Sequence, residues 1–301
     1  MDGYLERKVV SGIMFTLLLM GMLILTFNVQ PVKSAWTGTV YIRADGSIDP
    51  ADAPIITYDN VTYTLTDNIT SSADGIVVER NNIVIDCAGY TLQGTGAYES
   101  KGIILRRINN VTIKNVIINN FQDGIRLYDS LNNTILENNI TNNGYGILLW
   151  ESLNNTISGN NITANTYSGI WLTSSSDNGI DGNNIANNGD GIALTSSSNN
   201  RITGNTFFHN GLYVSNSYGN VVIENWVNGK PLVYLEDTSD LTVEDAGQVI
   251  LINCIKITVE NLNLSNISVG IRLLKTKNST ITRNNITNSR YGIWLESSSP
   301  H

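Results

Sequence analysis

The chain has 301 residues, of which 15% are charged and 41% hydrophobic, and its formal net charge is -8. Its 42 asparagines and 26 glycines disfavour helices, while a steady supply of Ile, Val and Leu is sufficient for a core. A helical enzyme and a disordered chain are therefore both excluded. The acidic balance argues against nucleic-acid partners, which bind to basic patches.

Residues 1–35 are predicted to form a signal peptide or signal anchor. Arg7 and Lys8 precede an uncharged apolar run at residues 9–27, whose length is close to that of a membrane-spanning segment. Val32 and Ser34 offer a cleavage site, so a cleaved signal and a retained anchor both stay open. In either case the chain after residue 35 is exported, either secreted or held at the membrane only through residues 9–27.

Residues 36–74 are irregular and are predicted to cap the start of a repeat region that covers residues 75–301. A Gly-Ile-x-Leu signature recurs there every 22 or 23 residues, and a fixed period in this range indicates a repeat architecture. The regular copies begin at Gly102, Gly124, Gly146, Gly169, Gly191, Gly270 and Gly292.

Each unit contains three short strand patterns separated by turns, which predicts an all-β fold, a right-handed parallel β-helix with coils of about 22 residues. In such a solenoid the first and third residues after the glycine point inward, and the second and fourth point outward. Stacked asparagine amides hydrogen-bond from one coil to the next. We expect this ladder at one recurring position, occupied by Asn138, Asn160, Asn183, Asn205 and Asn284.

The repeat is least regular between residues 213 and 270. Asn228-Gly229-Lys230-Pro231 is typical of a turn and is predicted to interrupt the stack, and regular coils return at residues 248–252. The sequence stops after one strand of a further coil, which favours a chain truncated at its C-terminus.

Three stretches carry a resemblance to a known family: residues 41–48 (YIRADGSI), 228–234 (NGKPLVY) and 247–251 (GQVIL). They resemble archaeal surface proteins classed with the NosD-type periplasmic copper-binding β-helix domain. The repeated coils are also similar to the parallel β-helix repeats of carbohydrate-binding proteins and sugar hydrolases. The resemblance covers about residues 36–301. For the NosD family it implies an exported protein that assists copper-centre maturation of nitrous oxide reductase.

The residues available for a metal are few. Copper sites use His, Cys or Met, and after residue 35 the chain offers only Cys87, Cys254, His209 and His301. Cys254 has the register of an inward core residue, and His209 lies in a turn, so no metal site is predicted. Calcium remains an alternative for the acidic residues between 236 and 245, but their spacing matches no known calcium loop, and a charged loop is favoured.

No catalytic residues are predicted. The outward positions of the middle coils contain neither acids nor histidine, and the best carboxylate pair, Asp129 and Glu151, follows the main strand on adjacent coils. Exposed acids in turns are normally solvated, so this pair is interpreted as a surface pair. A polysaccharide lyase or epimerase stays open as an alternative, as does a NosD-like copper accessory.

The outward positions do contain an unusual set of aromatic residues. Rows of aromatic rings at coil spacing suit stacking on sugar faces, although such rings also stabilise sheets by packing on one another. The candidate glycan-binding strip, along the sheet of main strands, consists of Tyr128, Trp150, Trp171, Tyr213 and Trp294.

The sequence thus predicts an exported surface or envelope protein that binds a polysaccharide or a cell-surface protein. Asn-x-Ser/Thr motifs are frequent in the repeats, but only those in turns are expected to be accessible to a glycosylating enzyme. The two candidate glycosylation sites are Asn132 and Asn154.

Overall fold

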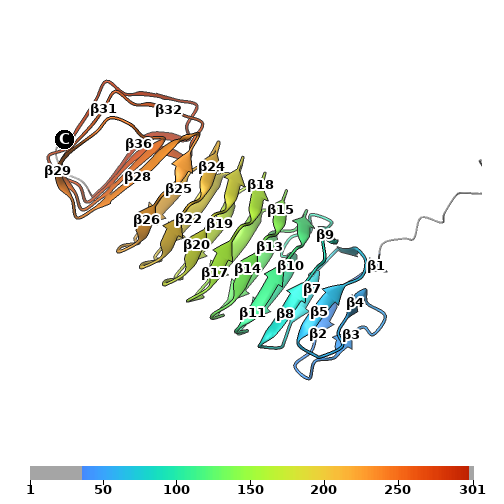
Figure 1. Ribbon diagram of the computed structural model, residues 1–301. Helices are drawn as coiled ribbons and strands as arrows, with labels where there is room; N and C mark the ends of the chain where they lie inside the picture. Colours follow the sequence, from blue (N-terminus) through green and yellow to red (C-terminus); the bar gives the residue numbers. More distant parts are fainter. Residues whose placement is uncertain (1–35, 298–301) are drawn as a thin grey trace, which may run out of the picture. The chain divides into compact units, whose positions relative to one another are not determined.

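Short parallel strands joined by tight bends repeat along residues 36–297, the part of the chain that the computed structural model describes. Figure 1 shows these strands stacked coil on coil from β1 to β36. The described residues contain no helix, and hence none that is long and apolar enough to cross a membrane. The prediction of an all-β parallel β-helix is confirmed. The predicted signal segment lies outside the described residues.

Three long sheets run along the solenoid. Sheet A contains β1 (Trp36–Thr37), β6 (Ile69–Ser71), β9 (Thr91–Gly94), β12 (Ile117–Asn119), β15 (Asn139–Thr141), β18 (Asn161–Thr163), β21 (Asn184–Ala186), β24 (Thr206–Phe208), β27 (Trp226–Val227), β28 (Lys230–Glu236), β30 (Gln248–Ile252), β33 (Val269–Leu274) and β36 (Tyr291–Glu296). Sheet B contains β3 (Ile48–Asp49), β2 (Val40–Ile42), β7 (Ile76–Val78), β10 (Lys101–Arg106), β13 (Asp123–Tyr128), β16 (Tyr145–Trp150), β19 (Ser168–Thr173), β22 (Asp190–Thr195) and β25 (Leu212–Ser215).

Sheet C contains β4 (Ile55–Ile56), β5 (Thr62–Leu65), β8 (Ile83–Asp86), β11 (Val111–Lys114), β14 (Thr134–Leu136), β17 (Thr156–Ser158), β20 (Gly179–Asp181), β23 (Arg201–Thr203) and β26 (Val221–Ile223). Two small sheets complete the later coils. One contains β29 (Ser239–Val243), β31 (Ile255–Glu260) and β34 (Thr280–Thr282), and the other β32 (Asn263–Ser265) and β35 (Asn285–Thr287). The segment predicted as a cap contributes β3 and β4, which end sheets B and C by antiparallel pairing.

Identical apolar residues stack on one another inside the solenoid. Ile125 pairs in register with Ile147, which pairs with Ile170 and then Ile192, and all four are fully buried. This column follows from the alternation of the strands, because a period of 22 or 23 residues returns the same side chain to the same inward position. The predicted inward positions are confirmed for the main strands from β10 to β33, whereas Ile293 and Leu295 on β36 are 46% and 51% exposed.

Buried asparagines form the ladders that hold the corners. Asn138 Nδ2 donates to Asn160 Oδ1 at 3.0 Å, and the same bond links Asn160 to Asn183 and Asn183 to Asn205, both at 2.9 Å. The ladder continues to Asn225 at 3.0 Å. The structure also contains two ladders that were not predicted, which consist of Asn133, Asn155, Asn178, Asn200 and Asn220, and of Asn143, Asn165 and Asn188.

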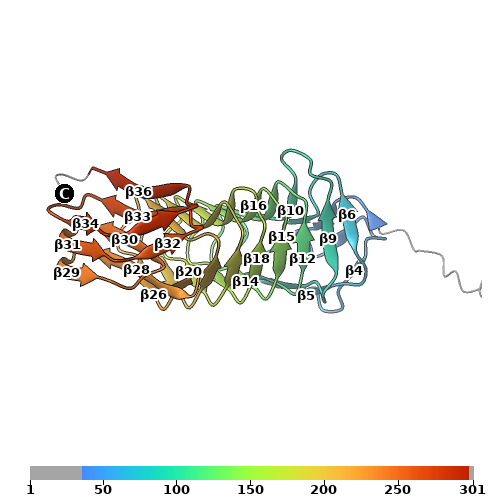
Figure 2. The same ribbon diagram turned by 90° about the horizontal axis from the view of Figure 1, so that it is seen from above.

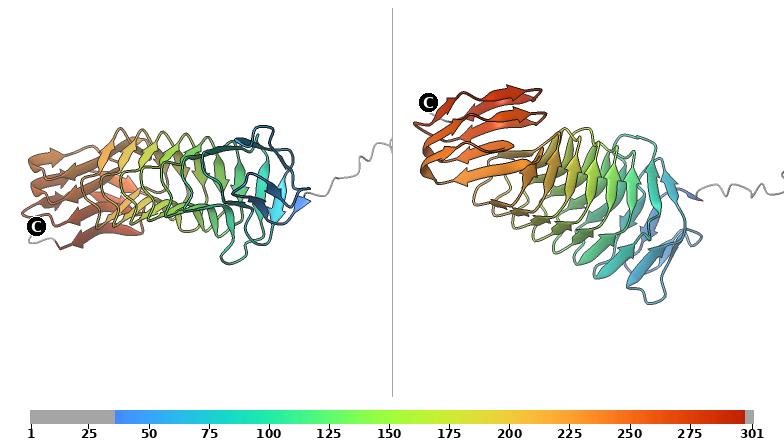
Figure 3. Two further views of the ribbon diagram at one scale, coloured as in Figure 1. Left: turned by 90° about the horizontal axis from the view of Figure 1, so that it is seen from below. Right: turned by 45° about the horizontal axis from the view of Figure 1, so that its top comes forward.

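The stack changes direction at the predicted Asn228–Gly229 turn. Both residues have a positive φ, and β27 and β28 pair antiparallel across the turn. The main strands before the turn belong to sheet B, which ends at β25, whereas β28, β30, β33 and β36 extend sheet A. Figures 2 and 3 show β28 to β36 as a second group of coils, coloured orange to red. Asn284 therefore bonds to Val259 O and Leu262 N in the second group and is not part of the Asn138 ladder.

One buried side chain links the two groups of coils. Gln248 Oε1 accepts from Leu212 N at 2.9 Å, and Gln248 Nε2 donates to Leu212 O at 2.8 Å and to Val269 O at 2.9 Å. Leu212 lies on β25, the last strand of sheet B. The glutamine amide therefore satisfies backbone groups that a further strand of sheet B would otherwise bind.

Candidate functional site

The main strands of sheet B are interrupted at their glycines. Lys101 pairs with Asp123 and Ile103 with Ile125, but the glycines between them are absent from the pairing. A Cβ on Gly124 would lie 2.5 Å from Gly146 O, so the backbones of adjacent coils approach too closely for any side chain. Because the alternation of side chains is broken at the glycine, the residue before it and the second residue after it both lie on the outer face. Tyr145 precedes Gly146, Trp171 is the second residue after Gly169, and their two rings are in contact.

Tyr145 and Trp171 form a stacked pair on the outer face of sheet B. Their ring centroids are 5.0 Å apart with an interplanar angle of 27°, and Tyr167 packs on the other side of Tyr145 at 4.9 Å. Trp171 Nε1 donates to Thr195 Oγ1 at 3.3 Å, which fixes the indole. Two cavities share this pair as a common wall.

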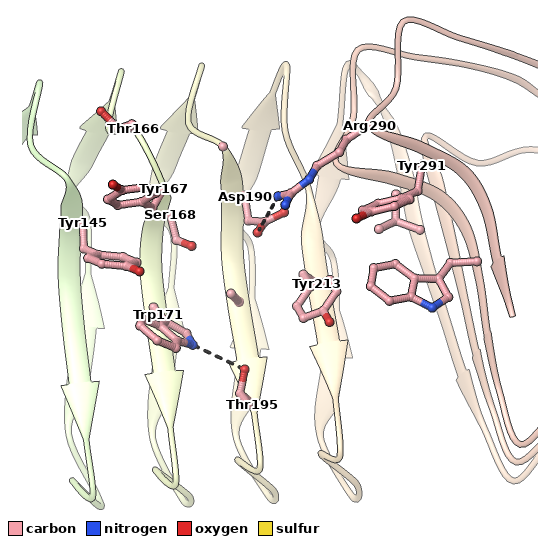
Figure 4. Close-up of a pocket in the computed structure, with 14 residues that line it drawn as sticks. Tyr145, Thr166, Tyr167, Ser168, Trp171, Asp190, Thr195, Tyr213, Arg290 and Tyr291 are labelled. Carbon is pink, nitrogen blue, oxygen red and sulfur yellow. Dashed lines mark hydrogen bonds and ion pairs between the residues drawn. The ribbon is translucent and has the colours of Figure 1, made fainter. Parts of the chain in front are cut away.

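The larger cavity, here called the corner pocket, has a volume of about 540 Å³ and lies where β36 meets the outer face of sheet B (Figure 4). It is lined by Tyr145, Thr166, Tyr167, Ser168, Trp171, Gly189, Asp190, Ala193, Thr195, Tyr213, Val269, Arg290, Tyr291 and Trp294. The smaller one, the side pocket, has a volume of about 440 Å³. It is lined by Tyr98, Glu99, Gln122, Asp123, Arg126, Tyr145, Leu148, Trp150, Trp171, Thr173 and Ser174. Both volumes are in the range of small-ligand sites.

The far wall of the corner pocket is aromatic and rests on a buried cation. Trp294 contacts Tyr213 at 5.6 Å and Tyr291 at 4.5 Å between ring centroids. The Arg272 guanidinium lies over both the Tyr213 ring, at 5.1 Å, and the Trp294 ring, at 4.6 Å, and is fully buried. Its Nη2 is 2.6 Å from Glu296 Oε2. These contacts fix the two rings from behind.

Each pocket contains one aspartate paired with an arginine, and Asp123 is buried while Asp190 is partly buried. Asp190 Oδ2 is 3.8 Å from Arg290 Nη1 in the corner pocket, and Asp123 Oδ2 is 3.3 Å from Arg126 Nη1 in the side pocket. Burial raises the pKa of both carboxyl groups above the ordinary aspartate value, and the neighbouring arginine opposes this shift in each case. Burial also raises the pKa of the Tyr145 hydroxyl.

The structure brings four of the five predicted aromatic residues into this cleft of two pockets. Trp150 lines the side pocket, Trp171 lines both, and Tyr213 and Trp294 line the corner pocket. Tyr128 lines neither, and instead meets Trp150 edge-on with ring centroids 5.8 Å apart. Whether the rings bind a glycan remains a prediction.

The expectation that one sheet carries all five rings is wrong for Trp294. It lies on β36 in sheet A, because the main strands leave sheet B at the Asn228–Gly229 turn. The change of direction nevertheless brings Trp294 against Tyr213, so that a straight strip becomes a corner.

Sequence reasoning missed Tyr145, Tyr167, Asp190, Arg290 and Tyr291. Strict alternation directs the residue before each glycine inward, and only the break at the glycine turns Tyr145 outward. The recurring glycine was a usable signal, because a glycine within a strand often marks a bulge. No sequence signal joins Asp190 to Arg290, which lie in different groups of coils.

Other predicted residues lie outside the cleft. Asp129 is paired with Arg107 at 3.3 Å, and Glu151 is exposed on the next coil. The candidate glycosylation sites Asn132 and Asn154 are exposed and have a positive φ, and their modification stays a prediction.

The acidic residues between 236 and 245 bind separate partners. Glu236 Oε1 accepts from Gly219 N at 2.8 Å, and Asp245 Oδ1 is 3.1 Å from Lys230 Nζ. Among residues 36–297, no three His, Cys, Asp or Glu side chains are grouped to hold a metal ion.

Comparison with known proteins identifies the family. The family described as "Periplasmic copper-binding protein (NosD)" matches residues 37–234, which is more than half of the chain. The chain belongs to the NosD family. The match covers sheets B and C and the β27–β28 turn, while Arg290, Tyr291 and Trp294 lie beyond it. No curated protein sequence matches the chain significantly.

The copper in the NosD description does not fit the described residues. The thiols of Cys87 and Cys254 are buried, and burial raises the pKa of each, which disfavours the thiolate that binds metals. His209 is exposed and stacks on Phe208, with its Nδ1 3.1 Å from Asn187 Oδ1. Residues 36–297 include no methionine.

Two enzymes with solved structures are similar to the chain. A lidless DFA-IIIase from Arthrobacter chlorophenolicus A6 is 14% identical over 78% of this chain and 69% of its own, with a TM-score of 0.54. A mutant of the same enzyme is 13% identical over 74% of this chain, with a TM-score of 0.51. This chain spans only 61% of that mutant's length. The periplasmic alginate epimerase AlgG, as a mutant, is 14% identical over 75% of this chain and 78% of its own, with a TM-score of 0.42. At these identities the similarity concerns the fold alone.

Proposed function

We propose that this protein is an extracytoplasmic oligosaccharide-binding protein of the envelope or cell surface, and that the cleft formed by the corner and side pockets is its binding site. The observation that carries the proposal is the stacked Tyr145–Trp171 pair, which stands between two cavities that each contain further aromatic rings. The periplasmic description of the NosD family supports the extracytoplasmic location.

Aromatic rings in a groove are suited to sugars because the C–H faces of a sugar ring stack on the face of an indole or phenol. The Trp150 ring is 42% exposed on one side of the shared wall, and Tyr213 and Trp294 line the cavity on the other side. Hydroxyl groups of a bound sugar would find both donors and acceptors in Thr195 and Asp190.

The two aspartates that pair with arginines in the cleft are too far apart to act together in glycoside hydrolysis. Asp123 and Asp190 begin strands β13 and β22, which are three strands apart in sheet B. At the spacing of neighbouring strands this separation is about 14 Å, beyond the roughly 9.5 Å at which two carboxyl groups cooperate in hydrolysis.

The test is a titration of the chain after residue 35 with a panel of oligosaccharides, followed by calorimetry on the ligand that binds most tightly. Replacing Trp171 with Ala removes the shared wall and is expected to weaken binding about tenfold or more. The matched control is Trp226→Ala, which removes an indole that is 47% exposed on β27 and lines neither pocket.

Binding that is lost in Trp171→Ala and kept in Trp226→Ala supports the proposal. The proposal fails if no oligosaccharide of the panel binds, or if the two variants bind equally well. Thermal melting of each variant establishes that the comparison is made on folded protein.

A further inference from the structure

Each arginine that lines the cleft is already paired with a carboxylate of this chain. Arg126 in the side pocket pairs with Asp123, and Arg290 in the corner pocket pairs with Asp190. The aspartate side chains are 3% and 16% exposed, so they lie beneath the arginines and toward the floor of the pockets. Neither guanidinium is left as an uncompensated positive charge.

The third arginine of the cleft is not accessible. Arg272 is fully buried behind the Tyr213 and Trp294 rings and pairs with Glu296. A ligand in the corner pocket would touch the rings and not this cation. Arg272 therefore supports the aromatic wall and supplies no charge to a ligand.

The charges that line the cleft are balanced or negative. The corner pocket has one carboxylate and one guanidinium, Asp190 and Arg290, and the side pocket has the carboxylates Glu99 and Asp123 against Arg126. A ligand carboxylate would lose its water and find no unpaired cation, at a considerable cost in free energy. A neutral sugar has hydroxyl groups that accept from guanidinium N–H and donate to carboxylate oxygen, and so suits a paired site.

We infer that the cleft selects neutral oligosaccharides over polyuronates, and that Asp123 and Asp190 set this preference by neutralising the arginines beside them. The inference rests on the proposed function and adds the class of ligand. Because the two pockets share the Tyr145–Trp171 wall, the ligand is a chain long enough to occupy both, with one unit on each side of the stacked pair.

The experiment compares two panels of oligosaccharides of equal length on the exported chain. One panel is neutral, with gluco-, manno- and fructo-oligosaccharides and methyl-esterified oligogalacturonate, and the other is anionic, with free oligogalacturonate and oligoalginate. The tightest ligand is expected in the neutral panel. Its affinity is expected to change little between low and high salt, because no net charge is bound.

Substitution of the aspartates should change the preference. Asp190→Asn and, separately, Asp123→Asn each release one arginine, and each is expected to raise the affinity for the uronate panel about tenfold, since a charge-assisted hydrogen bond becomes available. Asp129→Asn is the matched control, because it releases Arg107 outside both pockets and should leave uronate binding unchanged.

The outcomes separate the two proposals. If the unmodified chain binds uronates more tightly than neutral chains, the inference is overturned and the proposed function stands. If both aspartate variants fold, by thermal melting, and neither gains affinity for uronates, the role of the aspartates is refuted. Failure of both panels to bind contradicts the proposed function itself.

Discussion

The asparagine ladder allows a direct test of what holds the coils together. Asn160 is 1% exposed, and its Oδ1 accepts from both Asn138 N and Asn138 Nδ2 at 3.0 Å. Its Nδ2 donates to Ile135 O and Ser158 O at 3.0 Å and to Asn183 Oδ1 at 2.9 Å. Replacing Asn160 with Ala removes all five bonds at once, in the middle of the stack.

The cost is set by the groups that lose their partners. Asn138 N loses its acceptor, Asn160 Oδ1. By contrast, Asn138 Nδ2 still donates to Ile113 O, and Asn183 Oδ1 still accepts from the backbone N of residue 160. A buried unsatisfied N–H costs about 1–3 kcal/mol, and the small cavity left by the amide adds to this. We therefore expect Asn160→Ala to lower the free energy of unfolding by about 3 kcal/mol.

The assay is urea unfolding, with Asn161→Ala as the matched control. Asn161 follows Asn160 in the chain and bonds to Asn139 and Asn184, but its side chain is exposed. Its replacement should change the free energy of unfolding by less than about 0.5 kcal/mol. Equal effects of the two substitutions would refute the idea that the buried ladder, and not asparagine in general, stabilises the coils.

Three further predictions concern the strand break, the junction and a buried acid. Gly124→Ala places a Cβ 2.5 Å from Gly146 O, so the free energy of unfolding measured in urea should fall by about 1–3 kcal/mol. An unchanged unfolding midpoint would contradict the close approach of the two backbones. Gln248→Ala leaves Leu212 N without its acceptor, so the Leu212 amide should exchange faster with deuterium while amides of the middle coils do not. Burial raises the pKa of Asp123, so the folded chain holds that proton more tightly than the unfolded chain. The free energy of unfolding of the unmodified chain, minus that of Asp123→Asn, should therefore fall as the pH rises from about 3.9 upward. If urea unfolding gives a difference that is constant or rises with pH, this prediction is wrong.

Much of the fold could be predicted because the repeat is local. The inward Ile and Leu positions and the corner asparagines return with each coil, so a column such as Ile125, Ile147 and Ile170 follows from spacing alone. The turn at Asn228–Gly229 was also visible, since both residues favour a left-handed backbone. The sequence did not predict that the main strands move from sheet B to sheet A after the turn, because this depends on which sheet edge pairs with β28.

The candidate site was only partly predictable for the same reason. Trp150, Trp171 and Tyr213 follow from outward positions on the main strands β16, β19 and β25 of sheet B. Tyr145 does not, because its direction depends on a break in the strand that the close approach of two backbones imposes. The partner of Trp171 in the stacked pair was therefore missed.

The sequence by itself determined the coil, its core and the ladder that begins at Asn138, since these depend on contacts between residues about 22 positions apart. Only the tertiary structure decided the cleft. Tyr213 meets Trp294 and Asp190 meets Arg290 because the later coils join sheet A and turn back toward the outer face of sheet B. Such contacts carry no period in the sequence, and they arise from the Asn228–Gly229 turn, where the repeat is broken.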